Sequence, residues 1–203
     1  MTALGVPRDG MSSVLSAPQA RLEPDFFRRA VTEVARALIG VRLTVNGVGG
    51  LIVETEAYDR TDPASHAYRG RTIANAAMFG PPGCAYVYRS YGVHWCLNFV
   101  CGLELGGAVL IRALEPTDGV EVMRARRATD NPRRLCAGPG SLCQALGVTR
   151  AYNGLPLDRP PFELLSPARD YPIANGVRIG LTKAADTPWR FGLQGSPFLS
   201  RPF

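Results

Sequence analysis

The sequence predicts an α+β fold, a single compact mixed domain with a curved, mainly antiparallel sheet and flanking helices. Strand-like segments are joined to one another by short turns as well as by helices, which favours this class over a doubly wound parallel sheet. The 203 residues suffice for one domain with a substantial core. The chain is 46% hydrophobic and 20% charged, as expected for a globular domain.

The N-terminal segment, residues 1–20, is rich in Ser, Ala, Pro and Gly and lacks an apolar core. It therefore predicts a flexible tail rather than a signal peptide, and residues 21–203 form the predicted domain. No apolar run approaches the roughly 20 residues that span a bilayer, so no membrane partner is expected.

The first predicted element is a helix over residues 24–40, with a proline near its start, a glycine at its end and an apolar stripe between them. Two strands follow, residues 41–45 and 51–57, across a turn at Asn46-Gly47. Residues 58–83 are polar and punctuated by Gly and Pro, and a loop of that length is usually functional.

The next element is a hairpin over residues 86–99, in which aromatic and aliphatic side chains alternate. It breaks at Tyr91-Gly92, which places a tyrosine at the tip of a turn. Burial of an aromatic ring usually contributes a few kcal/mol, and a ring on a turn gives up that gain. The position therefore indicates a partner, and a base stack in nucleic acid accepts such a flat wedge.

The remaining elements are shorter. Residues 118–128 predict a helix whose last turn carries three arginines, where the helix dipole favours cations. A second short helix follows a Gly-Pro-Gly entry at residues 141–146. The remaining predicted strands are residues 108–114, 162–165, 177–181 and 189–193.

The net charge of +6 suits a polyanionic partner such as nucleic acid. Of the 23 basic residues only Lys183 is a lysine, and arginine binds phosphate bidentately. A GC-rich genome that favours arginine codons explains the same composition more simply. The charge alone therefore leaves nucleic-acid binding open.

Cysteine and histidine are too few and too scattered for a metal site. The five cysteines form no CxxC pair, and the chain has two histidines. We therefore expect no metal, no cofactor, and reduced thiols in a cytoplasmic protein.

Two carboxylates and an arginine are the candidates for chemistry. Glu54, Glu56 and Tyr58 share one face of a strand, because side chains alternate with a period of two. They form either a solvated strand edge or a carboxylate base beside an aromatic platform. Arg112 lies in an apolar strand and needs a partner there. Glu115 or Glu54 is one possibility, and a substrate or water group is the other.

Three further positions are ambiguous in isolation. His66 lies in the long loop and is either incidental or part of a site. Arg69 and Arg71 flank a glycine and suit a phosphate contact. Asn98 sits in an apolar strand, so its amide needs partners, which are either structural or a ligand.

These segments together resemble the alkyladenine (3-methyladenine) DNA glycosylase family of monofunctional base-excision enzymes. The pairing of VETEAY with YVYxxYGxxxCLN is highly specific, because no single structural demand generates both. The matching segments, in the family's order, are residues 53–58 (VETEAY), 66–70, 78–83 (MFGPPG), 86–98 (YVYRSYGVHWCLN), 110–116 (LIRALEP), 138–146 (GPGSLCQAL), 178–180 and 195–197.

The resemblance implies a catalytic group and a base pocket. Glu56 would be the general base that activates water, and Arg112 and the main-chain carbonyl of Ile179 would help to hold that water. The residues that would contact the flipped base are Tyr58, His66 and Tyr88, which stack on it, and Asn98, which discriminates against the exocyclic amine of guanine.

The resemblance also implies the partner, which is double-stranded DNA containing damaged purines. Tyr91 would occupy the gap left in the duplex, with Val93 and His94 beside it near the DNA. Arg69 and Arg71 are the expected phosphate contacts. The family fold is a single mixed domain with a curved antiparallel sheet, and it uses no metal. We expect a monomer in the bacterial cytoplasm, at the nucleoid.

The chain departs from its relatives at two possible phosphate contacts. Ile73-Ala74 stands where relatives commonly carry Pro-Arg, and Ser141 stands where many carry lysine. These changes bear on DNA affinity and substrate range rather than on the chemistry.

Three functional hypotheses follow. The first is a monofunctional glycosylase that removes alkylated purines, with deaminated purines as an open extension. The second is a bifunctional glycosylase/lyase, whose amine nucleophile would have to be Lys183. The third is a nucleic-acid-binding module without catalysis, which would leave Glu56 and Arg112 unexplained.

Overall fold

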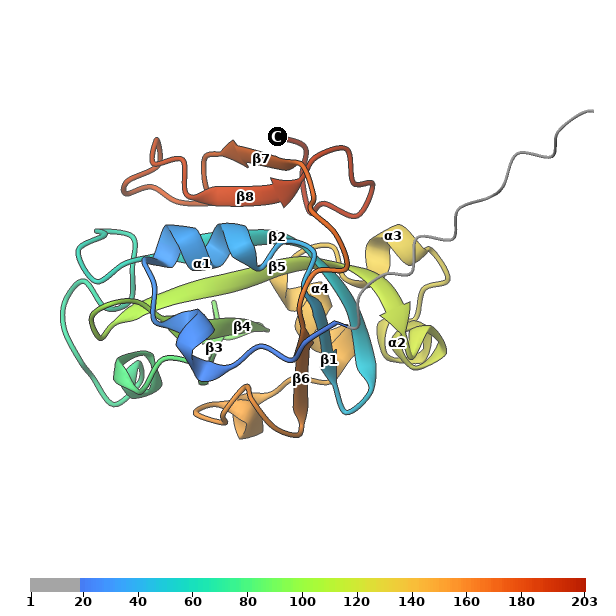
Figure 1. The fold of residues 1–203 in the computed structure, drawn as a ribbon, viewed down its shortest axis with the longest axis horizontal. Helices are drawn as coiled ribbons and strands as arrows, with labels where there is room; N and C mark the ends of the chain where they lie inside the picture. The colour runs from blue at the N-terminus through green and yellow to red at the C-terminus, as the bar shows by residue number, and fades with distance from the viewer. Residues whose placement is uncertain (1–18) are drawn as a thin grey trace, which may run out of the picture.

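A computed structural model of the protein describes residues 19–203 (Figure 1). The predicted tail, residues 1–20, lies outside this part of the chain except for Gln19 and Ala20. The main-chain amide of Ala20 donates to the Ser166 hydroxyl at 3.0 Å, and Gln19 donates to the Ser166 carbonyl. The bounds of the tail stay a prediction.

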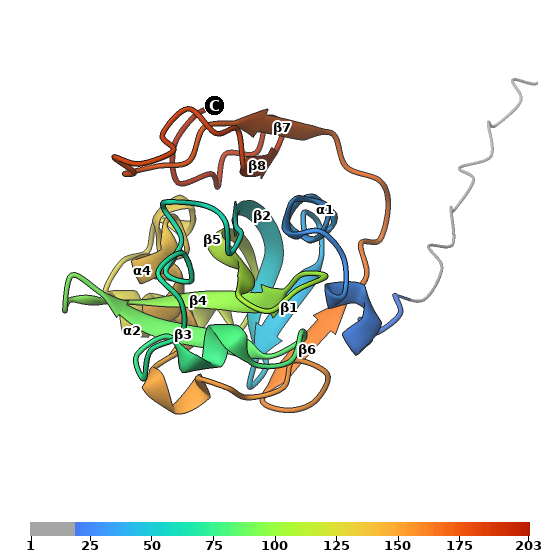
Figure 2. The ribbon, with the colours of Figure 1, turned by 90° about the vertical axis from the view of Figure 1, so that its left-hand side faces the viewer.

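The sheet has eight strands, all paired antiparallel, in the order β3-β4-β5-β2-β1-β6, and β8 and β7 extend from β2. The strand β2 is the hub, because it pairs with β5 along most of its length, with β1 in its first half and with β8 in its second. The predicted α+β fold with a curved antiparallel sheet is confirmed (Figure 2). The strands are β1 Arg42–Val45, β2 Val48–Tyr58, β3 Ala85–Ser90, β4 His94–Cys101, β5 Gly107–Asp118, β6 Phe162–Leu165, β7 Ile173–Gly176 and β8 Arg190–Leu193.

The helices cover the sheet from two sides. The helix α1 (Val31–Ala37) packs on β2 and β5, and α4 (Pro139–Leu146) packs on β4 and β5. Two helices lie against α4, α2 (Val120–Arg127) and α3 (Pro132–Leu135). The β7–β8 hairpin lies above α1 and β2 in both views (Figures 1 and 2).

The predicted helix over residues 24–40 is wrong in its middle. The chain forms a 3₁₀ turn, η1 (Pro24–Phe27), and then α1, and between them Ala30 is extended at ψ 140°. The apolar stripe nevertheless faces the core, because Phe27, Val31, Val34 and Leu38 are all buried. Burial of the apolar side chains against the sheet therefore determines the backbone here, and the helix is interrupted.

Other boundaries also differ from the prediction. The strand predicted over residues 51–57 begins at Val48, because Gly49 and Gly50 let the neighbouring backbones approach closely. A Cβ on Gly50 would lie 1.9 Å from the Glu115 carbonyl oxygen. No strand forms over residues 177–181. The strand in this region is β7, which ends at Gly176.

The helical boundaries shift in the same way. The helix α2 begins at Val120 because Asp118 still pairs with β2, and α4 begins at Pro139. The helix α3 was not predicted, because it is only four residues long; the Asn131 side chain caps it.

Both predicted tight turns are confirmed. Asn46 and Gly47 have φ values of 50° and 75°, and Tyr91 and Gly92 have 49° and 68°. Positive φ at both central residues matches the twist of antiparallel hairpins. The β3–β4 hairpin projects from the body of the protein (Figure 2), and the Tyr91 side chain at its tip is 93% exposed.

The long loop, residues 59–83, is ordered by its own side chains and contains a 3₁₀ turn, η2 (Ala76–Phe79). Asn75 is buried, and its amide donates to the carbonyls of His66 (2.8 Å) and Gly70 (3.0 Å). A small apolar cluster lies beneath the loop, apart from the main core, and consists of Ala67, Met78, Tyr86, Val100 and Ala108. These contacts hold the loop in a defined conformation. Within residues 19–203 no helix is both long and apolar enough to cross a bilayer.

Candidate active site

One cavity of about 490 Å³ brings most of the predicted site residues together. Its size lies in the range of pockets for small ligands. Its walls come from β2, the long loop, β3, β4, β5, the start of α4 and the segment before β8. The predicted residues that line it are Tyr58, His66, Tyr88, Tyr91, Asn98, Arg112 and Ile179.

One wall of the cavity is aromatic. The rings of His66 and Tyr88 meet edge to face at 4.5 Å, and Tyr86 stacks with Tyr88 at 5.4 Å. The Tyr86 hydroxyl lies 2.9 Å from His66 Nδ1. Burial raises the pKa of Tyr86 to about 12, so the phenol stays protonated at neutral pH. Such electron-rich walls suit a flat cationic ligand. The sequence had not singled out Tyr86.

Arg178 supports the ring of Tyr58 from behind. Its Cζ lies 4.7 Å from the centroid of the Tyr58 ring, and its Nη1 donates to the Ala57 carbonyl at 2.9 Å. It pairs with Asp62 in the long loop, and both side chains are buried. The sequence placed Arg178 only within a matching segment, because its partner is 116 residues away.

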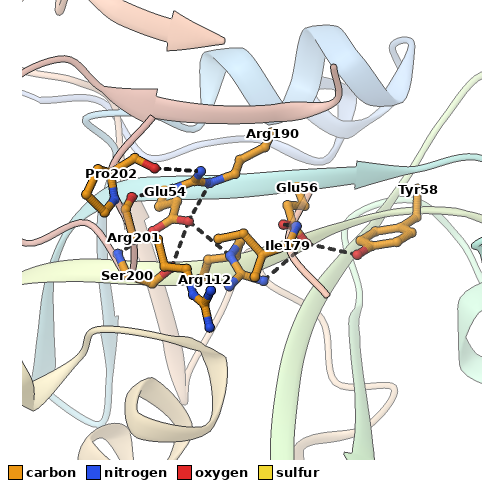
Figure 3. A network of polar contacts seen from close by, with 9 residues as sticks. All are labelled: Glu54, Glu56, Tyr58, Arg112, Ile179, Arg190, Ser200, Arg201 and Pro202. Carbon is orange, nitrogen blue, oxygen red and sulfur yellow. Dashed lines mark hydrogen bonds and ion pairs between the residues drawn. The ribbon is translucent and has the colours of Figure 1, made fainter. Parts of the chain in front are cut away.

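Glu54 and Glu56 are completely buried, so the interpretation of these residues as a solvated strand edge is wrong. Arg112 reaches both carboxylates from β5 (Figure 3). Its Nε lies 3.0 Å from Glu54 Oε1, and its Nη1 lies 3.2 Å from Glu56 Oε2. The sequence indicates Glu54 and Glu115 as possible partners of Arg112. The structure pairs Arg112 with Glu54 and not with Glu115. Arg112 also lines the cavity.

The two carboxylates differ in how fully they are hydrogen-bonded. Glu56 accepts from the Ile179 amide (2.7 Å, to Oε1), the Tyr58 hydroxyl (2.8 Å, to Oε2) and Arg112. A carboxylate has about four acceptor positions, so Glu56 keeps one, on Oε1. Glu54 accepts four hydrogen bonds, two of them from Ser200, with three on Oε1 and one on Oε2. All three donors of Glu56 line the cavity, whereas Arg112 is the only donor of Glu54 that does, so Glu56 is the carboxylate next to the cavity.

The charge states of the neighbouring groups agree with this arrangement. Burial opposes the charge of Arg112, but Glu56 and Glu54 outweigh it and hold the pKa of the guanidinium above its usual value. Burial, with Glu56 beside it, raises the pKa of the Tyr58 phenol. The Tyr58 hydroxyl thus keeps its proton and donates it in a hydrogen bond to Glu56.

Asn98 has the structural partner that one of the two interpretations requires. Its Nδ2 donates to the Tyr86 carbonyl at 3.1 Å, and its side chain lines the cavity. The structural hydrogen bond fixes the amide at the cavity wall.

Five predicted residues do not line the main cavity, namely the buried Glu56 together with Arg69, Arg71, Val93 and His94. Arg69 and Arg71 are exposed on the long loop, and neither forms an ion pair within residues 19–203. Val93 and His94 are also exposed and line a second cavity of about 320 Å³, against α4. The Ser141 hydroxyl accepts from Arg127, and Ile73 is almost fully exposed.

No group of three or more His, Cys, Asp or Glu side chains is arranged for a metal ion in the part of the chain that the structure describes. All five cysteines are free thiols.

His66 gives a pH-dependent prediction. Burial of its packed side lowers its pKa below the usual value of about 6.5. The stability contributed by the neutral ring is therefore complete above pH ~6.5 and is lost as the pH falls through the folded-state pKa. An NMR titration, with the resonance assigned by His66→Asn, should give a midpoint below 6.5. A midpoint at or above 6.5 contradicts this packing.

An exposed tyrosine on a hairpin, beside an aromatic cavity backed by a buried carboxylate, suits an enzyme that extrudes a base and cleaves its bond to the sugar. The fold and the site thus define a DNA glycosylase. Comparison with known proteins gives the family. The sequence model of the methylpurine-DNA glycosylase family matches residues 25–197, and the chain belongs to this family. It is a DNA repair glycosylase, a monofunctional hydrolase, and the hypothesis of a non-catalytic module is wrong.

Relatives match over almost the whole chain, and three of them carry the name "Putative 3-methyladenine DNA glycosylase". The protein from Rhodopseudomonas palustris (strain HaA2) is 61% identical over 199 residues, which are 95% of this chain and 99% of the relative. The protein from Nitrosospira multiformis is 60% identical over 178 residues, 87% of this chain and 92% of the relative. The protein from Bradyrhizobium diazoefficiens is 59% identical over 183 residues, 90% and 92% respectively.

Proposed function

We propose that this protein flips alkylated purines, 3-methyladenine among them, out of double-stranded DNA and hydrolyses their N-glycosidic bonds. The base enters the cavity of about 490 Å³, and Glu56 activates the attacking water. One observation carries this proposal. Glu56 is held by three donors and keeps a single acceptor position on Oε1, immediately behind the cavity wall.

The chemistry needs little beyond a base and a positioned water. Hydrolysis at C1′ passes through an oxocarbenium-like state, by analogy with glycosidases. A 3- or 7-alkylated purine is already cationic, so its departure needs little acid help. Glu56 takes a proton from the water, and Arg112 holds the carboxylate and the water in place. The carbonyl of Ile179, whose amide donates to Glu56, is the further proposed water ligand.

The cost of flipping is recovered by stacking and phosphate contacts. Extrusion costs a few kcal/mol of lost base stacking, and an aromatic contact recovers about 1–3 kcal/mol per base. Tyr58, Tyr88 and His66 stack on the flipped base, while Tyr91 fills the gap. Arg69 and Arg71 are exposed and suit the phosphate contacts.

Asn98 is the proposed discriminator against guanine, because its amide is fixed at the cavity wall by the Tyr86 carbonyl. Val93 and His94 flank the wedge and are proposed to face the DNA. We propose a monomer that acts at the nucleoid in the bacterial cytoplasm.

Lys183 gives no support to a lyase step. It is the only lysine, it is exposed, and it does not line the cavity. A Schiff base at C1′ requires an amine within bonding distance of the sugar. Water is therefore the proposed nucleophile.

The direct test uses a duplex oligonucleotide with one alkylated purine. We expect release of the free base, an abasic site that breaks only after alkali treatment, and no covalent protein–DNA adduct after borohydride reduction. Absence of base release contradicts the proposed activity, and a trapped adduct contradicts the use of water.

Tyr91→Ser tests the wedge. The ring is 93% exposed, so its removal leaves the fold unchanged, while excision from duplex DNA falls roughly 10-fold or more through lost stacking. Excision from single-stranded DNA changes much less. Leu103→Ser is the matched control, since Leu103 is 80% exposed on the β4–β5 loop and outside the cavity. Equal duplex excision by both variants contradicts the role of Tyr91.

A further inference from the structure

Glu54 is a buried carboxylate that the proposed reaction does not use. Its donors come from β5, β8 and the C-terminal end of the chain, all far from Glu54 in the sequence (Figure 3). Arg112 Nε on β5 lies 3.0 Å from Oε1, and Arg190 Nε on β8 lies 2.8 Å from the same atom. Ser200 adds its hydroxyl (2.8 Å, to Oε1) and its amide (2.6 Å, to Oε2). The Ser200 hydroxyl also accepts from Arg112 Nη2 at 3.3 Å.

The segment over residues 200–203, here called the C-terminal strap, is held in place by further contacts. Arg190 donates to the carbonyls of Arg201 and Pro202, the latter at 3.2 Å, and its Cζ lies 4.0 Å from the centroid of the Phe203 ring. Gly192 leaves room for this ring, because a Cβ there would lie 2.3 Å from Phe203. The strap is thus packed closely against β8.

We propose that Glu54 and the C-terminal strap are positioning elements that fix Arg112, and through it the free acceptor position of Glu56. This inference rests on the proposed function. Glu54 and Ser200 hold the Nε and Nη2 sides of the guanidinium, which leaves a single donor, Nη1, for Glu56. The Oε1 position of Glu56 thereby stays open for water.

Without Glu54, Arg112 would be free to pair differently with Glu56. An arginine beside a single carboxylate prefers a bidentate pair, in which two N–H groups bind both oxygens. Arg112 would then cover Oε1 of Glu56. Two carboxylates now balance two guanidiniums, and loss of Glu54 leaves Arg112 and Arg190 to share one negative charge in a buried site.

Glu54→Gln tests the positioning role. We expect the single-turnover excision rate to fall on the order of 10–100-fold, because small misplacements in an active site cost about this much. Affinity for a lesion duplex with a 2′-fluoro sugar, which resists hydrolysis, should stay within about 2-fold because Glu54 does not line the cavity and the stacking side chains are kept. Glu115→Gln, on the same strand as Arg112 but without contact to it, is the matched control and should retain both properties.

Ser200→Ala and Phe203→Ala extend the test in case Glu54→Gln does not fold. Ser200→Ala removes one hydroxyl from a charged network, and we expect a roughly 5-fold slower single turnover with unchanged affinity. Phe203→Ala loosens the strap and should act in the same direction.

The outcomes separate this inference from the proposed function. Wild-type excision rates in the folded strap and Glu54 variants, while Glu56→Gln is inactive, overturn the inference and leave the function intact. A lower melting temperature with an unchanged rate in the folded protein shows a merely structural role and also overturns it. Failure of the wild type to excise overturns both.

Discussion

Glu56→Gln should abolish base excision and leave binding to lesion DNA largely intact. The amide cannot take a proton from water, and general-base catalysis contributes about 10²–10⁴-fold to the rate. The substitution keeps the size of a side chain that is completely buried and touches Tyr58, Arg112 and the Ile179 amide. Single-turnover excision and equilibrium binding on the same lesion duplex measure the two effects separately.

Glu115→Gln is the control for this substitution, because Glu115 lies on β5 and makes no contact with Arg112. It should excise at the wild-type rate. Near-normal excision by Glu56→Gln, with the control also active, removes Glu56 as the base. Loss of binding that parallels the loss of rate means that Glu56 only maintains the pocket.

Asp62→Asn should destabilise the protein by about 3–5 kcal/mol, because it removes one partner of a buried ion pair and leaves the other charged. Arg178 is 4% exposed, Asp62 is 5% exposed, and the two side chains make two hydrogen bonds. The guanidinium also stacks on Tyr58 and Trp189. Urea unfolding of the variant and the wild type measures the difference in the free energy of unfolding.

The matched control is Asp158→Asn, which breaks an exposed pair with Arg159. Solvent screens that pair, so the free energy of unfolding should stay unchanged within error. Equal stability of both variants and the wild type contradicts the structural role of the Asp62–Arg178 pair.

The parts of the fold set by local chemistry could be predicted from the sequence. Asn46-Gly47 and Tyr91-Gly92 form the expected turns because few residue pairs tolerate two positive φ values. The cavity residues were found because their motifs are specific, and Tyr58, His66, Tyr88, Asn98 and Arg112 do line one cavity.

The parts set by distant contacts could not be predicted. Residues 28–30 interrupt the predicted helix because the apolar side chains on either side are buried against the sheet. Glu54 resembles Glu56 in sequence, and only its bonds to Arg190 and Ser200, 136 and 146 residues away, distinguish the two. No local pattern in the sequence encodes such pairings.

A crystal structure of Glu56→Gln bound to a duplex with one alkylated purine tests the base-flipping mechanism most directly. We predict the purine in the main cavity, stacked against Tyr58 on one side and His66 and Tyr88 on the other, with Tyr91 in the gap and C1′ facing residue 56. A damaged base that stays in the helix, or that occupies the second cavity beside His94 and α4, contradicts the mechanism.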